Sequence, residues 1–277
     1  MVRFLAVPAI FGSTPPGASD VVDETLGNVI ATAIAATALA WLLLRRFPPP
    51  PRPAIVENVA AHEIGKLLES ALTDTKRWWF DGSTGRFQRA TTLREMSRWA
   101  RQDGTSREVT IVLLDPQDES LCLSYANYRR GLASGKGRDW TVDSVRRDIY
   151  ATLLAAQTYH EKEPLTVTVA LKQRMSILRY DLSDSRLVIT KEGRNDPAIA
   201  CPAGSFHYEA YLEDLRWGLK QARPIDLRQA TVPPTGFDRN SAREALRAMG
   251  VYTAALDADS LVDSILAEAL SQEHPYS

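Results

Sequence analysis

Cysteine and histidine are scarce in this sequence. The 277 residues include two cysteines and four histidines. Cys122 and Cys201 are far apart, and neither has a cysteine or histidine companion at the short spacing of a zinc-ligand pair. The same spacing gives no disulfide framework, as is usual for a protein in a reducing compartment. We therefore expect no bound metal and no cofactor.

Charge is absent from residues 26–44, which read LGNVIATAIAATALAWLLL. At ~1.5 Å per residue, a helix of this length reaches across a ~30 Å hydrocarbon layer. Acidic residues precede the segment and Arg45 and Arg46 follow it, an order of charges opposite to that of a cleaved signal peptide. We therefore predict one transmembrane helix over residues 26–44. A buried core helix is the alternative.

Arg45 and Arg46 also predict an orientation for this helix. By the positive-inside rule, residues 1–25 form an extracytoplasmic tail and the rest of the chain is cytoplasmic. The expected location is the bacterial inner membrane, crossed once with the N-terminus outside. Small residues four apart, such as Ala31 and Ala35, favour close helix association, so we expect a homo-oligomer. The alternative is that alanine is simply abundant in this chain.

The segments beyond residue 44 differ in composition. Residues 45–53 are a basic and proline-rich linker, because proline runs act as semi-rigid spacers. Residues 54–235 have the length of one ordinary α/β domain. Residues 236–277 form a helical tail that is acidic, with 3 Lys and Arg against 7 Asp and Glu.

The pattern of apolar residues between 57 and 222 alternates between two periods. A helical spacing predicts a first helix over residues 57–72, and short apolar runs predict strands at 77–81, 108–115 and 165–171. Helical patterns separate these strands, and further strands follow at 175–182, 186–191 and 198–201 before a closing helix. Such an order predicts an α/β domain with a mixed sheet and flanking helices.

This order of elements, together with the run RYDLSDSRLVIT at 179–190, resembles the phospholipase D-like fold. The resemblance implies a catalytic HxKxxxxD signature, in which histidine is the nucleophile and lysine neutralises phosphate charge. The signature is missing from this chain. His160 and Lys162 form an HxK triplet, but Val167 stands where the aspartate should be. The resemblance therefore implies a degenerate domain, and we predict no catalytic residues.

Basic and aromatic residues are interleaved between residues 76 and 107. This stretch contains eight Lys and Arg but three acidic residues. Arginine beside aromatic rings is suited to phosphates and bases. The loop after residue 81 lies at the carboxyl end of a predicted strand, where open α/β sheets bind ligands. The alternative is a core of aromatics beneath a solvated helix face, with His207 an ordinary surface residue at a helix start. The predicted ligand-binding residues are Ser83, Thr84, Arg86, Arg89, Asp115 and His207.

The layout resembles that of membrane effectors in bacterial anti-phage defence, which join a sensor domain to membrane helices. The resemblance implies a nucleotide or oligonucleotide ligand, made by a nucleotidyltransferase encoded nearby. We therefore expect a sensor whose ligand drives association of the helix at 26–44 and perturbs the membrane. Two alternatives stay open: a membrane-tethered phospholipase D-like phosphodiesterase or nuclease, and a scaffold that docks a partner through the acidic tail.

Overall fold

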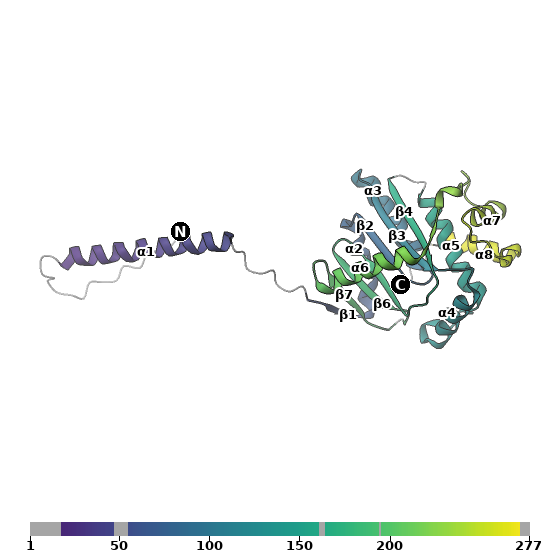
Figure 1. Ribbon diagram of the computed structural model, residues 1–277, viewed down its shortest axis with the longest axis horizontal. Helices are drawn as coiled ribbons and strands as arrows, with labels where there is room; N and C mark the ends of the chain where they lie inside the picture. Colours follow the sequence, from purple (N-terminus) through teal and green to yellow (C-terminus); the bar gives the residue numbers. More distant parts are fainter. Residues whose placement is uncertain (1–17, 47–54, 161–163, 194, 272–277) are drawn as a thin grey trace. The chain divides into compact units, whose positions relative to one another are not determined.

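The computed structural model describes residues 18–46, 55–160, 164–193 and 195–271 (Figure 1). The chain divides into two compact units, residues 1–52 and 53–277. In the described part of the first unit, residues 18–46 form the single helix α1 (Ala18–Arg46). The second unit contains the sheet and the helices that cover it.

Helix α1 includes the charge-free segment 26–44. Among the residues that the structure describes, no helix is both long and apolar enough to cross a membrane. The predicted transmembrane helix is therefore wrong, and with it the single-pass topology and the location in a bacterial inner membrane. The physical reason is composition: ten of these nineteen residues are Ala, Gly, Thr or Asn, which carry no charge but add little apolar surface.

The second unit is built on a mixed sheet, which confirms the predicted α/β class. In the described residues the sheet has eight strands in the order β1-β7-β6-β5-β2-β3-β4-β8. The strands are β1 (Glu57–Val59), β2 (Arg77–Asp81), β3 (Arg107–Leu114), β4 (Leu165–Lys172), β5 (Leu178–Leu182), β6 (Arg186–Lys191), β7 (Ala198–Pro202) and β8 (Arg223–Ile225).

The neighbouring strands β2, β3 and β4 run parallel to one another, and every other pairing is antiparallel. Phe80 of β2 pairs with Ile111 of β3, which pairs with Val169 of β4. Their carboxyl ends therefore lie at one edge of the sheet, which we call the carboxyl edge. Because β5 and β6 alternate in direction, the start of β5 and the end of β6 lie at the same edge.

Helices cover both faces of the sheet (Figure 1). One face packs against α2 (Ile64–Asp74), α3 (Leu93–Asp103) and α5 (Val142–His160), which supply most of the core. The other face carries α6 (Phe206–Gln221), which buries Tyr208 and Leu215 against β5, β6 and β7. The described part of the tail adds α7 (Arg239–Ala248) and α8 (Asp259–Leu270), whose apolar residues join the core around α5, and α4 (Glu119–Gly131) follows β3.

The start of the second unit differs from the predicted helix over residues 57–72. Glu57 to Val59 form the strand β1, with Glu57 opposite Ala200 of β7, and α2 begins only at Ile64. Backbone hydrogen bonding to β7 outweighs the helical spacing of the apolar side chains in this segment.

Candidate functional site

The loop that follows β2 is held firmly at the carboxyl edge. The hydroxyl of Thr152, on α5, donates a hydrogen bond of 2.7 Å to the carbonyl oxygen of Thr84. The amide of Leu114 donates to the carbonyl oxygen of Ser83 at 3.0 Å. Gly85 has a φ of +73°, and a Cβ there would lie 2.8 Å from Thr152 Cγ2, so this close approach requires glycine.

This loop leads directly into two arginines that share one carboxylate. Arg89 is 2% exposed; its Nη1 donates to the carbonyl oxygen of Asp148 and to Thr152 Oγ1, both at 3.0 Å, and its Nη2 pairs with Glu268. Burial lowers the pKa of Arg89, against the opposing charges of Asp148 and Glu268. Arg86 Nε lies 3.8 Å from Glu268 Oε1, and its side chain is 29% exposed.

A second carboxylate, Asp148, is fully buried on the first turns of α5. Its Oδ1 lies 2.7 Å from Arg138 Nη2 and 3.7 Å from Arg147 Nε. The guanidinium of Arg138 also lies over the ring of Trp140, 4.9 Å from its centroid. Arg129 lies 4.5 Å from the centroid of the same ring. Trp140 therefore links the arginines beside Asp148 to Arg129 at the end of α4.

A third carboxylate, Glu192, lies just after β6. It accepts a hydrogen bond of 2.9 Å from Tyr125 Oη and one of 3.2 Å from Arg179 Nη1, and it pairs with Arg129. Burial alone would raise the pKa of Glu192, but Arg179, Arg129 and Tyr125 hold it below its usual value, with a contribution from the charge of Arg86. Arg86 therefore lies within electrostatic range of both Glu192 and Glu268.

These contacts form one connected group, which we call the arginine cluster. Six guanidinium groups face three carboxylates, so the group carries a net charge of three positive, since arginine stays protonated in proteins. Each arginine side chain is less than a third exposed. The arginine cluster comprises Arg86, Arg89, Arg129, Arg138, Arg147 and Arg179, with Asp148, Glu192 and Glu268 as its carboxylates.

Several polar atoms in the arginine cluster are buried without a hydrogen-bond partner in the part of the chain that the structure describes. The donors are the Nε atoms of Arg89, Arg129 and Arg147 and the indole Nε1 of Trp140. One acceptor, Asp148 Oδ2, also has no partner. Buried donors without acceptors are costly, and here they outnumber the unpaired acceptor four to one. The cluster has both the charge and the spare donors for an anion.

The structure brings together some of the predicted ligand-binding residues. Arg86 and Arg89 belong to the arginine cluster, and Ser83 and Thr84 are buried in the loop before them. Asp115 lies at the same edge but is already neutralised, because both of its oxygens lie within 3.0 Å of Arg223 Nη2.

His207 is not part of this edge. It follows β7, whose last residue, Pro202, lies opposite Arg186 at the start of β6, so His207 lies at the other edge of the sheet. It is exposed on the first turn of α6, where the cap is Ser205, whose Oγ accepts from the amide of Tyr208.

Most of the arginine cluster was not predicted. Arg129, Arg138, Arg147 and Arg179 come from a helix end, a loop, a helix start and a strand, over a span of about fifty residues. The one local signal was the glycine-rich basic loop GLASGKGRD at 131–139, which contains Arg138 and begins two residues after Arg129.

A separate ion pair lies on the α6 side of the carboxyl edge. Lys172, the last residue of β4, pairs with Asp81, the last residue of β2, and the two side chains are 7% and 6% exposed. Burial lowers the pKa of Lys172, against the charge of Asp81. Helix α6 covers the pair closely, because a Cβ added at Gly218 would lie 3.9 Å from Asp81 Oδ2.

A buried polar chain crosses the opposite face of β2. Trp78 Nε1 donates to Gln88 Oε1 at 2.9 Å, and Gln88 Nε2 donates to Asp181 Oδ1 at 2.8 Å. Burial raises the pKa of Asp181 to about 6, against the lowering effects of Arg179 and of the hydrogen bond from Gln88. Asp181 therefore changes charge in a mildly acidic range.

Asp181 is expected to make the protein less stable as the pH rises from about 4 to about 6. In this range the folded state binds the proton more tightly than the unfolded state, so stability is greatest at the lower pH and declines by about 3 kcal/mol. Urea unfolding of the wild type and of Asp181→Asn at several pH values measures the difference. The wild type should lose stability relative to the variant over this range.

Asp184→Asn is the matched control, because the contribution of Asp184 to stability should change with pH in the opposite direction. Burial opposes ionisation of Asp184, but hydrogen bonds from the amides of Lys76 and Arg77 and from the Arg77 side chain hold its pKa below the usual value. Its contribution to stability is therefore present at neutral pH and lost as the pH falls through that lowered pKa. A wild-type profile parallel to that of Asp181→Asn would show that Asp181 is not buried as described.

No protein-family model matches this chain, and no curated protein matches it in sequence. Among solved structures, one neighbour is TrmBL2, an archaeal chromatin protein described as showing a novel mode of DNA binding. It is 10% identical with a TM-score of 0.36, and the match covers 75% of this chain and 67% of that chain. At such scores the likeness establishes no common function.

A second structural neighbour is a phosphatidylserine synthase from Haemophilus influenzae Rd KW20. The two chains are 12% identical with a TM-score of 0.43, and the match covers 77% of this chain. It covers 49% of the synthase, so this chain spans about half the length of that enzyme. At this score the function has to be argued from the geometry of the carboxyl edge.

Proposed function

We propose that this protein binds a phosphate-bearing ligand, a nucleotide or an oligonucleotide, at the arginine cluster. The observation that carries the proposal is the net charge of three positive on the arginine cluster, in which the Nε atoms of Arg89, Arg129 and Arg147 and the indole nitrogen of Trp140 have no acceptor among the described residues. Guanidinium groups match the oxygen geometry of phosphate and bind it through paired hydrogen bonds. A phosphate would supply the missing acceptors and reduce the repulsion among the arginines.

Binding fits this edge better than hydrolysis. The three described histidines that could act as nucleophiles, His62, His160 and His207, lie outside the arginine cluster. No group of three or more His, Cys, Asp and Glu side chains that could hold a metal is found among the residues that the structure describes. The cluster therefore contains neither of the usual means of activating a phosphodiester for hydrolysis.

The ligand is proposed to act as a signal. A nucleotide made by a nucleotidyltransferase would bind at the arginine cluster and promote association between copies of the chain through α1. Support for the second step is the exposure of apolar side chains on α1, where Val29, Ile34 and Leu39 are 66%, 64% and 59% exposed. A role in anti-phage defence would follow from such a signal-dependent assembly.

The binding step is tested with ATP by calorimetry and with a fluorescein-labelled ten-nucleotide RNA by anisotropy. Both should bind the wild type. Arg86→Ala should weaken binding about ten- to hundredfold, because it removes one charge-assisted hydrogen bond to phosphate. Arg101→Ala on α3 is the matched control, because Arg101 is exposed outside the cluster, and its affinity should equal that of the wild type.

Two results would overturn the proposal. If neither probe binds, or if both variants lose affinity equally, the arginine cluster is not a phosphate site. Product analysis on the same mixtures separates the enzyme alternative, because release of phosphate or cleavage of the RNA by the wild type would show a hydrolase.

A further inference from the structure

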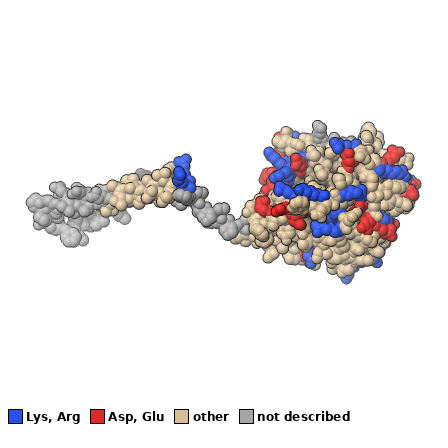
Figure 2. Space-filling view, in the orientation of Figure 1, with Lys and Arg blue, Asp and Glu red and all other residues tan. Residues whose placement is uncertain are grey.

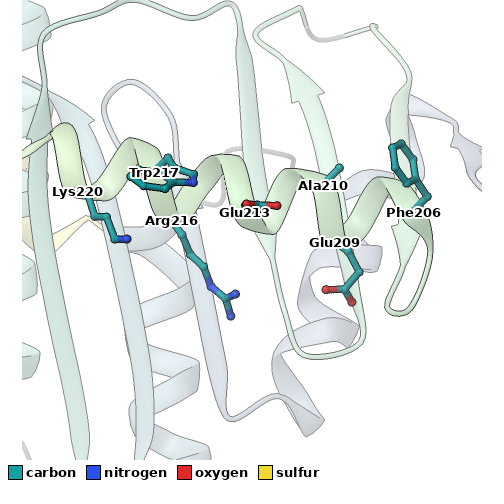
Figure 3. Close-up of a pocket in the computed structure, with 7 residues that line it drawn as sticks. All are labelled: Phe206, Glu209, Ala210, Glu213, Arg216, Trp217 and Lys220. Atoms are coloured by element: carbon teal, nitrogen blue, oxygen red, sulfur yellow. The ribbon is translucent and has the colours of Figure 1, made fainter.

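Helix α6 presents an outward face that the fold does not use. Phe206 and Trp217 on this face are 81% and 55% exposed, while Tyr208 and Leu215 on the inner face are buried against the sheet. The outward face lines an open hollow of about 520 Å³ (Figure 3). Large exposed aromatic side chains that are not needed for the core point to an interaction surface.

The residues of this face follow the spacing of a helix-packing seam. Phe206, Ala210, Glu213, Trp217 and Lys220 recur at alternating intervals of four and three residues, which is the heptad spacing of helices that pack side by side. The seam runs along the whole 16-residue helix, a length of ~24 Å. A second helix is therefore the natural occupant of this face.

The charges on the face are divided between the two halves of the helix. Glu209 and Glu213 lie in the amino-terminal half, and Arg216 and Lys220 lie in the carboxyl-terminal half. Figure 2 shows acidic and basic side chains close together on the face of the domain that carries α6. The face is therefore complementary to a copy of itself turned end to end.

We propose that this face, the α6 seam, binds the α6 seam of a second copy in an antiparallel arrangement about a two-fold axis. Glu209 then faces Lys220 of the partner subunit, and Glu213 faces Arg216 of the partner subunit. A parallel arrangement would place like charges together and is disfavoured. Such a symmetric contact uses the same patch on both subunits and closes as a dimer.

The aromatic residues add apolar contact to this arrangement. The register that pairs the charges places Trp217 near the two-fold axis and Phe206 at the two ends. Lys220 Nζ lies 4.2 Å from the centroid of the Trp217 ring, which fixes the indole on the surface. One helix face offers less contact area than the ~800 Å² per subunit of a standard interface. We therefore expect a weak dimer that dissociates on dilution.

The proposed dimer is independent of the arginine cluster. The loop before Arg86 and the helical turn that carries Arg89 pack against α5, which covers the opposite face of the sheet from α6. Association through the α6 seam therefore leaves that site open, and either proposal can fail without the other.

Reversal of the charges tests the proposal with the full chain. Sedimentation velocity over a range of concentrations should show a monomer–dimer equilibrium for the wild type. One variant, Glu209→Lys with Glu213→Lys, and a second, Arg216→Glu with Lys220→Glu, should each weaken the dimer more than tenfold. An equal mixture of the two variants should form a heterodimer, because the opposing charges are again complementary.

Glu244→Lys, an exposed residue on α7, is the matched control and should dimerise like the wild type. Circular dichroism should show that each variant is folded. The proposal is overturned if the wild type is monomeric at every concentration. It is also overturned if both charge reversals leave the dimer unchanged, which would indicate another surface such as α1, or if the mixed variants do not associate.

Discussion

Lys172→Met is expected to lower the free energy of unfolding by about 3–5 kcal/mol, the usual cost of leaving one partner of a buried ion pair without the other. Lys172 and Asp81 are each less than a tenth exposed, and α6 closes over them. The variant leaves the Asp81 carboxylate buried beside a methionine. Urea or guanidinium unfolding at pH 7 measures the loss.

The double variant Asp81→Leu with Lys172→Met should recover most of this loss, because replacing a buried ion pair with apolar residues is often neutral or stabilising. Arg239→Met is the matched control, since Arg239 and its partner Asp263 are both 49% exposed, and it should cost less than about 1 kcal/mol. Equal losses for Lys172→Met and Arg239→Met would contradict the burial of the Lys172–Asp81 pair.

Glu192→Gln is expected to cost about 3–5 kcal/mol in dilute buffer, because it leaves the buried Arg129 and the partly buried Arg179 without their carboxylate. It also raises the net charge of the arginine cluster by one unit. Pyrophosphate should therefore stabilise the variant more than the wild type, since a ligand that binds the folded state raises its stability by mass action. Unfolding with and without 10 mM sodium pyrophosphate, against sodium chloride at equal ionic strength, measures both effects.

Asp226→Asn is the control for this experiment, because Asp226 lies at an exposed pair with Arg228 outside the cluster. It should change stability little and should not alter the response to pyrophosphate. If pyrophosphate stabilises the wild type and Glu192→Gln equally, the anion does not bind beside Glu192, and the proposed site loses its main support.

The centre of the fold could be predicted from the sequence, because its signals are local. The continuous apolar run of β3 and the strict alternation of β4 identify both strands, and the loop that leads to Arg86 and Arg89 follows β2 directly. Parallel strands place their carboxyl ends together, so two of the six arginines of the candidate site, Arg86 and Arg89, follow from this order.

The remainder of the site depends on the arrangement of the sheet in space. Arg179 joins Arg86 only because β5 pairs antiparallel with β2, and the sequence alone does not give that pairing. His207 was expected beside the loop, but the direction of β7 places it at the opposite edge. Position along the chain therefore identified two arginines of the candidate site and missed those that the topology brings together.

The charge-free segment shows a different limit of sequence reasoning. Its helical pattern was recognised, and residues 26–44 do lie within α1. The absence of charge was taken as a measure of apolarity. Alanine and threonine carry no charge, yet they contribute little apolar surface. The two properties have to be judged separately.

The outermost strands of the sheet have a consequence for how copies of this protein can meet. β1 and β8 are each three residues long, and β8 contains Pro224, which has no amide hydrogen to donate. Such short outer strands, one of which contains a proline, are poor templates for β-augmentation by a foreign chain. The sheet is therefore protected against growth into fibrillar aggregates, and encounters between folded copies are left to helical surfaces.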